Sequence, residues 1–183
     1  MKRYIMAATA AVFWLASLAP AMADAGYDHE ISGDPVRFQW KLNPDKKTIQ
    51  IRLSAQTKSW VAVGFNPDQR MQGADFVMGY VKKGKVKVTD HFGTGVFVHK
   101  KDESLGGAMN VFDVSGKEAG GVTEISFSRP LDSGDAYDKP IVPDRETTLL
   151  LAYGAGRDSF RAAHAFRAVY KVSLSTGAFK KVR

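Results

Sequence analysis

The sequence predicts an all-β fold, an immunoglobulin-like antiparallel β-sandwich. Short segments alternate apolar and polar residues, and glycine, proline, asparagine or aspartate stands at most of the joins between them. No segment beyond the first 23 residues has a convincing helical period. A sheet with one apolar face must bury that face, so about nine short strands in one domain imply two packed sheets. An up-and-down barrel remains the alternative.

The strands are predicted in order along the chain. Residues 36–42 (VRFQWKL) alternate without error, and residues 48–53 (TIQIRL) repeat the pattern after the turn-like sequence NPD, which predicts a hairpin. Seven further strands are expected at residues 60–65, 76–81, 86–92, 111–114, 122–127, 147–153 and 166–174. The long connections 93–109 and 129–145 are expected to be functional or mobile loops.

Residues 1–23 have the features of a cleaved signal peptide. Lys2 and Arg3 precede an apolar stretch, and the small residues around Ala21 and Ala23 form a cleavage site. We therefore expect one domain over residues 24–183, in the periplasm or secreted. No later stretch has the roughly 20 consecutive apolar residues of a membrane helix, so no membrane span is expected.

The absence of cysteine excludes several kinds of site. Disulfides, thiolate zinc sites, iron–sulfur clusters, blue-copper centres and covalently attached c-type haem all need this residue. Any haem must therefore be held non-covalently.

The charge is moderately basic. Removal of the first 23 residues leaves 24 basic and 19 acidic residues, a net charge of +5. Lysines alternate with valine in several predicted strands, which indicates a solvated sheet face or a docking surface for an acidic redox partner or anionic membrane. Nucleic acid is not an expected partner of an exported protein.

Two residues suggest a haem site. Met71 is a lone thioether in a polar loop between two apolar strands, and His164 stands just before the last alternating segment. His164 has the same parity as Phe166 and Ala168, so it is expected to point with the apolar face toward a pocket. Methionine and histidine together form an axial ligand pair of low-spin haem iron in electron-transfer proteins.

A family resemblance rests on several motifs. WVAVGF at residues 60–65, followed by MQGADFVMGYV at residues 71–81, resembles the core signature of DOMON domains. FSRPLDSGD at 127–135, LLAYG at 150–154 and the segment around His164 resemble the same family and follow in the expected order. The resemblance spans most of residues 24–183 and implies a β-sandwich.

In the haem-binding branch of that family, exemplified by the cytochrome domain of cellobiose dehydrogenase, haem lies at one end of the sandwich. This resemblance implies that Met71 and His164 ligate a non-covalent haem b. It also implies an electron carrier and not an enzyme, serving a separate redox partner such as a dehydrogenase or a membrane cytochrome. A related bacterial branch, similar to the haem subunit of ethylbenzene dehydrogenase, pairs methionine with lysine, so the second ligand stays open.

Other histidines and methionines are weaker candidates. Met78 is the rival thioether, although its place in an apolar strand favours packing. His29, His91 and His99 lie among charged neighbours and are expected to be solvated.

Three other functions stay open. The first is a non-haem module that binds a sugar or another small ligand through aromatic residues such as Trp40, Trp60 and Tyr153. The second is a calcium site in the loop that contains Asp132, Asp135 and Asp138, although the spacing lacks an EF-hand pattern. The third is a Met/His copper site.

Overall fold

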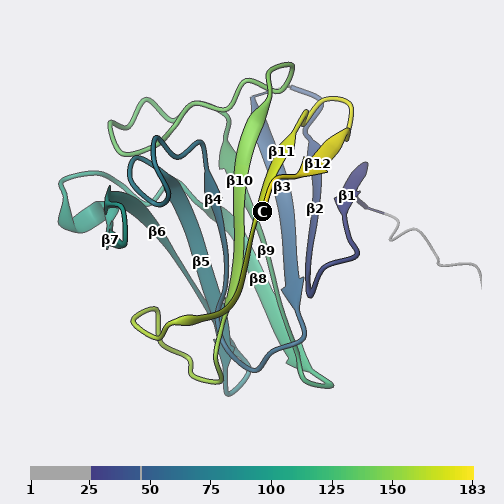
Figure 1. The fold of residues 1–183 in the computed structure, drawn as a ribbon, viewed down its shortest axis with the longest axis vertical. Coiled ribbons are helices and arrows are strands. Elements are labelled where there is room, and N and C mark those ends of the chain that lie inside the picture. Colours follow the sequence, from purple (N-terminus) through teal and green to yellow (C-terminus); the bar gives the residue numbers. More distant parts are fainter. Residues whose placement is uncertain (1–25, 46) are drawn as a thin grey trace, which may run out of the picture.

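The protein is a β-sandwich, as the sequence predicts. The computed structural model describes residues 26–45 and 47–183, and the expected signal peptide lies outside these residues. Figure 1 shows two layers of antiparallel strands, with β4, β5 and β10 in one and β2, β3 and β9 in the other. No helix of the described residues is long and apolar enough to cross a membrane.

Within residues 26–45 and 47–183, the smaller sheet has five strands in the order β1-β2-β3-β9-β8. The predicted hairpin is present, and the pairing of Val36 with Ala55 and of Leu42 with Ile49 sets its register. The strands span His29–Ile31 (β1), Val36–Leu42 (β2), Thr48–Ala55 (β3), Phe112–Ala119 (β8) and Val122–Pro130 (β9).

The larger sheet has seven strands in the described part of the chain, in the order β12-β11-β10-β4-β5-β6-β7. Its central strand β4 is buried on both faces along its whole length, because a second layer of loops covers the side away from the core. The strands span Val61–Phe65 (β4), Asp75–Lys82 (β5), Lys85–Gly95 (β6), Val98–Lys101 (β7), Thr147–Gly154 (β10), His164–Val172 (β11) and Phe179–Lys181 (β12).

The main core lies between the two sheets. Alternate residues of β3 point into it, so Ile49, Ile51 and Leu53 are fully buried while their neighbours are partly exposed. Trp40 is also fully buried, and its indole Nε1 donates a hydrogen bond of 2.8 Å to the backbone oxygen of Leu174. The buried indole is thus satisfied inside the sandwich.

The structure adds three strands that the sequence did not predict. β1 and β12 have three residues each, and β7 is the short polar segment VHKK. β7 and a 3-10 turn at Asp102–Ser104 (η1) lie within the connection 93–109, which was expected to be a loop. Hydrophobic alternation cannot identify such short or polar edge strands, because pairing with a neighbour defines them.

Candidate functional site

A second apolar cluster covers the outer face of the larger sheet. Its buried members are Trp60, Ala62, Ala74, Phe76 and Met78. Met78 therefore packs within an apolar cluster, as expected for a mid-strand methionine. A sheet face is apolar on its outer side only where something covers it.

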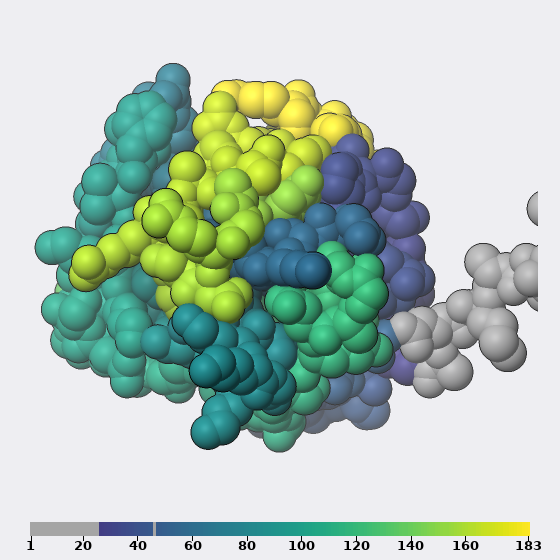
Figure 2. Space-filling model, turned by 90° about the horizontal axis from the view of Figure 1, so that it is seen from below, coloured from purple at the N-terminus to yellow at the C-terminus, as the bar shows by residue number. Residues whose placement is uncertain are grey.

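The cover comes from two segments far apart in the sequence. The hairpin around residues 95–98 joins β6 to β7, and residues 155–163 join β10 to β11. Viewed from below, the yellow-green 155–163 segment reaches across this end of the sandwich toward the teal strands β6 and β7 (Figure 2). The cover leaves hollows between itself and the sheet.

The larger hollow, here called the apolar cavity, has a volume of about 650 Å³, and both Met71 and His164 line it. This size lies within the usual range of small-molecule and cofactor sites, roughly 300–1,000 Å³. Small residues on the sheet, Ala62 and Ala152, leave room above the strands, and Trp60, Met78 and Leu150 supply apolar surface.

The loop between β4 and β5 holds Met71. The amide of Ala74 donates to the backbone oxygen of Met71 at 3.1 Å, and the amide of Gly73 donates to the oxygen of Gly93 at 2.8 Å. A Cβ on Gly93 would overlap the backbone oxygen of Met71, so only glycine lets β6 approach this loop so closely. Met71 is thereby fixed at the cavity wall.

His164 is the first residue of β11 and reaches the cavity in a way that strand parity did not predict. Phe166 pairs with Tyr153, whereas His164 pairs with Gly154, so a β-bulge shifts the register by one residue. Tyr170 and Val172 pack in the core, while His164, Arg167 and Val169 line the cavity on the other face. The pocket was expected on the face of Phe166 and Ala168. Ala168 contributes to the cavity lining, whereas Phe166 packs against the core, because the alternation breaks at the bulge.

Met71 and His164 approach the apolar cavity from opposite ends of the sheet. Phe65 pairs with Asp75 at the end of β4 that leads to the Met71 loop. At the other end, Val61 pairs with Tyr153, close to the Gly154–His164 pair. Met71 and His164 thus line the cavity near its two ends along the strand direction.

Arginines stand at the edges of the apolar cavity. Arg70, Arg161, Arg167 and Arg183 all contribute to its lining. The Arg70 guanidinium lies 4.8 Å from the centre of the Phe97 ring, and Phe97 is 65% exposed at the hairpin tip. The site therefore combines an apolar interior with cationic groups at its edge.

A second hollow, here called the basic cavity, adjoins the first and has a volume of about 520 Å³. His99, Phe160 and Arg161 line both cavities. Lys87, Lys100 and Lys101 contribute to the wall of the basic cavity, so these lysines are not only part of a solvated sheet face.

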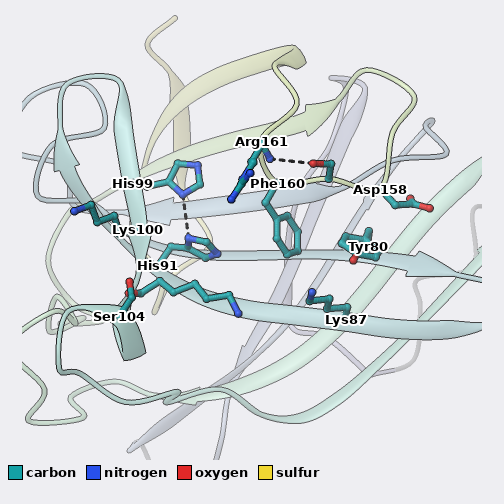
Figure 3. A pocket seen from close by; sticks show the side chains of 11 residues that line it. Tyr80, Lys87, His91, His99, Lys100, Ser104, Asp158, Phe160 and Arg161 are labelled. Carbon is teal, nitrogen blue, oxygen red and sulfur yellow. Dashed lines mark hydrogen bonds between the residues drawn. The ribbon is translucent and has the colours of Figure 1, made fainter.

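His91 and His99 are not the solvated side chains that the sequence suggested. His91 is 6% exposed, and its Nδ1 lies 3.0 Å from Nδ1 of His99 (Figure 3). Burial lowers the pKa of His91 to about 4, with contributions from His99 and Lys101, and burial also lowers the pKa of His99. The prediction of solvated side chains, made from the charged sequence neighbours, was wrong because β7 pairs with β6 and brings His99 against His91.

An acidic cluster surrounds a buried arginine on the other side of β5 and β6. The Arg129 guanidinium is 1% exposed and lies 2.6 Å from the Asp75 carboxylate. Carboxylate oxygens of Asp75, Asp90 and Asp138 lie within 4.8 Å of one another. Burial is the main cause that raises the pKa of Asp90 to about 8 and that of Asp102 to about 7.

The loop that was considered as a possible calcium site is divided in the structure. Asp138 joins this buried cluster, whereas Asp132 and Asp135 accept hydrogen bonds from backbone amides nearby. Two of the three aromatic residues suggested for ligand binding also serve the fold. Trp40 lies in the core and Tyr153 stacks on Phe166 with ring centres 5.7 Å apart, so only Trp60 lines the apolar cavity.

Comparison with known proteins agrees with this architecture. The profile of the DOMON domain matches residues 32–154, more than half of the chain. The chain belongs to the DOMON domain family. The family assignment from the sequence motifs is thereby confirmed.

Curated relatives and solved structures both contain similar domains. DBH-like monooxygenase protein 1 of Mus musculus is 28% identical over 145 residues, which cover 78% of this chain and 23% of that protein. MOXD1 homolog 2 of Drosophila melanogaster is 29% identical over 131 residues, which cover 70% of this chain and 17% of that protein. The chain spans less than a quarter of the length of these relatives.

Two solved structures share the fold. The cytochrome b domain of pyranose dehydrogenase from Coprinopsis cinerea superposes with a TM-score of 0.59 and 9% identity, covering 78% of each chain. The cytochrome domain of Myriococcum thermophilum cellobiose dehydrogenase gives a TM-score of 0.57 and 12% identity, covering 78% of this chain and 76% of that one. At this identity the likeness establishes the fold alone.

Proposed function

We propose that this domain binds haem b non-covalently in the apolar cavity and carries electrons, with Met71 and His164 as the axial ligands. The observation that carries the proposal is that a thioether and an imidazole line one cavity and approach it from opposite ends of the sheet. Met71 and His164 would hold the iron of a haem bound in this cavity, one from each end of the strands.

The donor set and the cavity wall both fit haem. Bound haem iron supplies one-electron chemistry, and a Met/His pair raises its reduction potential. Trp60, Met78 and Leu150 offer apolar contact to a porphyrin, and the indole Nε1 of Trp60 is buried without a partner among the described residues. Arg161 and Arg167 at the cavity edge suit the propionates, because a guanidinium matches carboxylate geometry.

If Met71 and His164 both held the iron, no position would be left open for oxygen or a substrate, which favours electron carriage over catalysis. The two solved neighbours are cytochrome domains of dehydrogenases, and this supports a redox partner of that kind for the present chain. We propose that the partner is a separate dehydrogenase or membrane cytochrome, and that they meet in the periplasm or outside the cell.

The experiment is an absorption spectrum of the oxidised and the dithionite-reduced protein after haem addition. Sharp α and β bands in the reduced protein indicate six-coordinate low-spin iron. His164→Ala and Met71→Ala are each expected to convert the spectrum to a high-spin form. His29→Gln and Met109→Leu are matched controls, because His29 lies beside Trp40 and Met109 is exposed on a loop outside the cavity lining.

Two results would contradict the assignment. If Met78→Leu abolishes the low-spin spectrum while Met71→Ala keeps it, Met78 is the sulfur ligand. If the protein takes up no haem at all, the cavity has a different ligand.

The second candidate is a non-haem module that binds a small ligand in the same cavity. The name of one relative, DBH-like monooxygenase protein 1, describes a monooxygenase and not a cytochrome, and this supports a ligand other than haem. A colourless protein whose Trp60 fluorescence changes on addition of a sugar or another small ligand would support this alternative.

A further inference from the structure

The basic cavity differs in chemistry from the apolar cavity beside it. Lys87, Lys100, Lys101 and Arg161 contribute to its wall, and Asp158 is the one acidic residue among the described residues that line it. None of the four cationic side chains forms an ion pair with a described residue. Like charges around one hollow repel each other, and an anion bound among them would offset part of that repulsion.

Some lysines elsewhere in the described chain have acidic partners. Lys139 pairs with Asp68 at 2.8 Å and Lys171 pairs with Glu146 at 2.5 Å. The cations of the basic cavity have no acidic partner among the described residues, although the chain contains 19 acidic residues. Lys87 lies over the Tyr80 ring at 5.9 Å, and the grouping places positive charge that no carboxylate neutralises around one cavity.

Aromatic rings form the inner wall of the basic cavity. Figure 3 shows the Phe160 ring between His91 and Tyr80. The centre of the Phe160 ring lies 5.0 Å from that of Tyr80 and 5.8 Å from that of His91. These faces offer flat apolar contact beside the cationic groups, which is the combination that a planar organic anion needs.

The His91–His99 pair supplies ring nitrogens that donate or accept a hydrogen bond, depending on the tautomer. His91 is engaged at both nitrogens, with Nδ1 toward His99 and Nε2 2.9 Å from Oγ1 of Thr89. No hydrogen bond joins Nε2 of His99 to another described residue. When His91 donates from Nδ1, His99 accepts there and carries its proton on Nε2, where it is available to a ligand.

We propose that the basic cavity is a binding site for small organic anions, with a carboxylate among Lys87, Lys101 and Arg161 and an adjoining flat group against Phe160. The carboxylate has two sources: a free small molecule, or the propionates of a haem in the apolar cavity, which shares His99, Phe160 and Arg161 with this site. The proposal does not rest on haem binding, because the charges and rings are features of the chain itself.

The test uses the haem-free full domain and benzoate as the probe, followed by NMR of the histidine side chains. Benzoate is expected to shift the ring signals of His91 and His99 saturably and to raise their pKa values, while those of His29 stay in place. Benzyl alcohol has the same ring without the charge and is expected to cause no saturable shift.

Charge variants make the test specific to the cavity. Lys101→Gln is expected to weaken benzoate binding about two- to fivefold, the usual effect of one exposed ionic contact. Lys85→Gln removes the same charge from an exposed position on β6 that does not line the cavity, and it is expected to leave the affinity unchanged. Equal weakening by both variants, or no histidine shifts with the parent protein, overturns the proposal.

The haem-loaded domain separates the two sources. If benzoate binding is lost by tenfold or more after haem is added, the propionates occupy the basic cavity. If the affinity is retained, free anions are the ligands. Because binding is first measured without haem, a failure to take up haem leaves this test intact.

Discussion

Asp90→Asn should stabilise the protein at neutral and alkaline pH. The Asp90 side chain is 3% exposed, and its Oδ2 accepts a hydrogen bond of 3.2 Å from the backbone amide of Asn110. Its Oδ1 has no partner among the described residues. An asparagine keeps the acceptor oxygen, and its amide replaces Oδ1 beside the carboxylates of Asp75 and Asp138.

The magnitude follows from the pKa of Asp90, which burial raises from 3.8 to about 8. Between these values the folded state keeps a proton that the unfolded state releases, so the stability falls as the pH rises. The slope for one proton is about 1.4 kcal/mol per pH unit. Over about three units, from pH 4 to pH 7, Asp90 costs roughly 4 kcal/mol, and Asp90→Asn removes that cost.

The assay is urea denaturation of the haem-free domain from pH 4 to pH 9, followed by tryptophan fluorescence. The two proteins should be nearly equal in stability at pH 4, and the variant should gain steadily up to about pH 8. Asp28→Asn is the control, because Asp28 is exposed near the start of the described chain and its carboxylate lies outside the buried cluster. A difference between Asp90→Asn and the parent that does not change with pH would refute the reasoning.

Three further changes test other parts of the structure. Arg129→Leu leaves the buried Asp75 carboxylate without its cation and should lower the free energy of unfolding by about 3–5 kcal/mol in urea denaturation; a loss below about 1 kcal/mol would contradict this. Gly64→Val places a Cβ against the Phe76 ring and should cost about 1–3 kcal/mol by the same assay, whereas an unchanged midpoint would mean that Phe76 moves aside. Trp40→Phe removes the donor to the Leu174 oxygen and should cost about 1–3 kcal/mol, and a neutral result would show that water replaces the indole.

The sequence determined the fold class and most of the strands. Residues 36–42 form β2 at the predicted bounds, because the alternation of VRFQWKL fixes which side chains enter the core. The DOMON motifs identified the family, and they singled out Met71 and His164, which line one cavity. Their role as iron ligands stays a prediction.

Only the tertiary structure decided what covers the outer face of the larger sheet. The alternation of apolar and polar residues along a strand predicts which side chains are buried against the other sheet. It does not predict which distant loops cover the outer face. The His91–His99 pair depends on the pairing of β6 with β7, and the bulge at Gly154 turns His164 toward the cavity against its strand parity. Arg129 and its aspartates likewise come from separate strands and loops, so their proximity follows from the packing of the sandwich and from no local pattern.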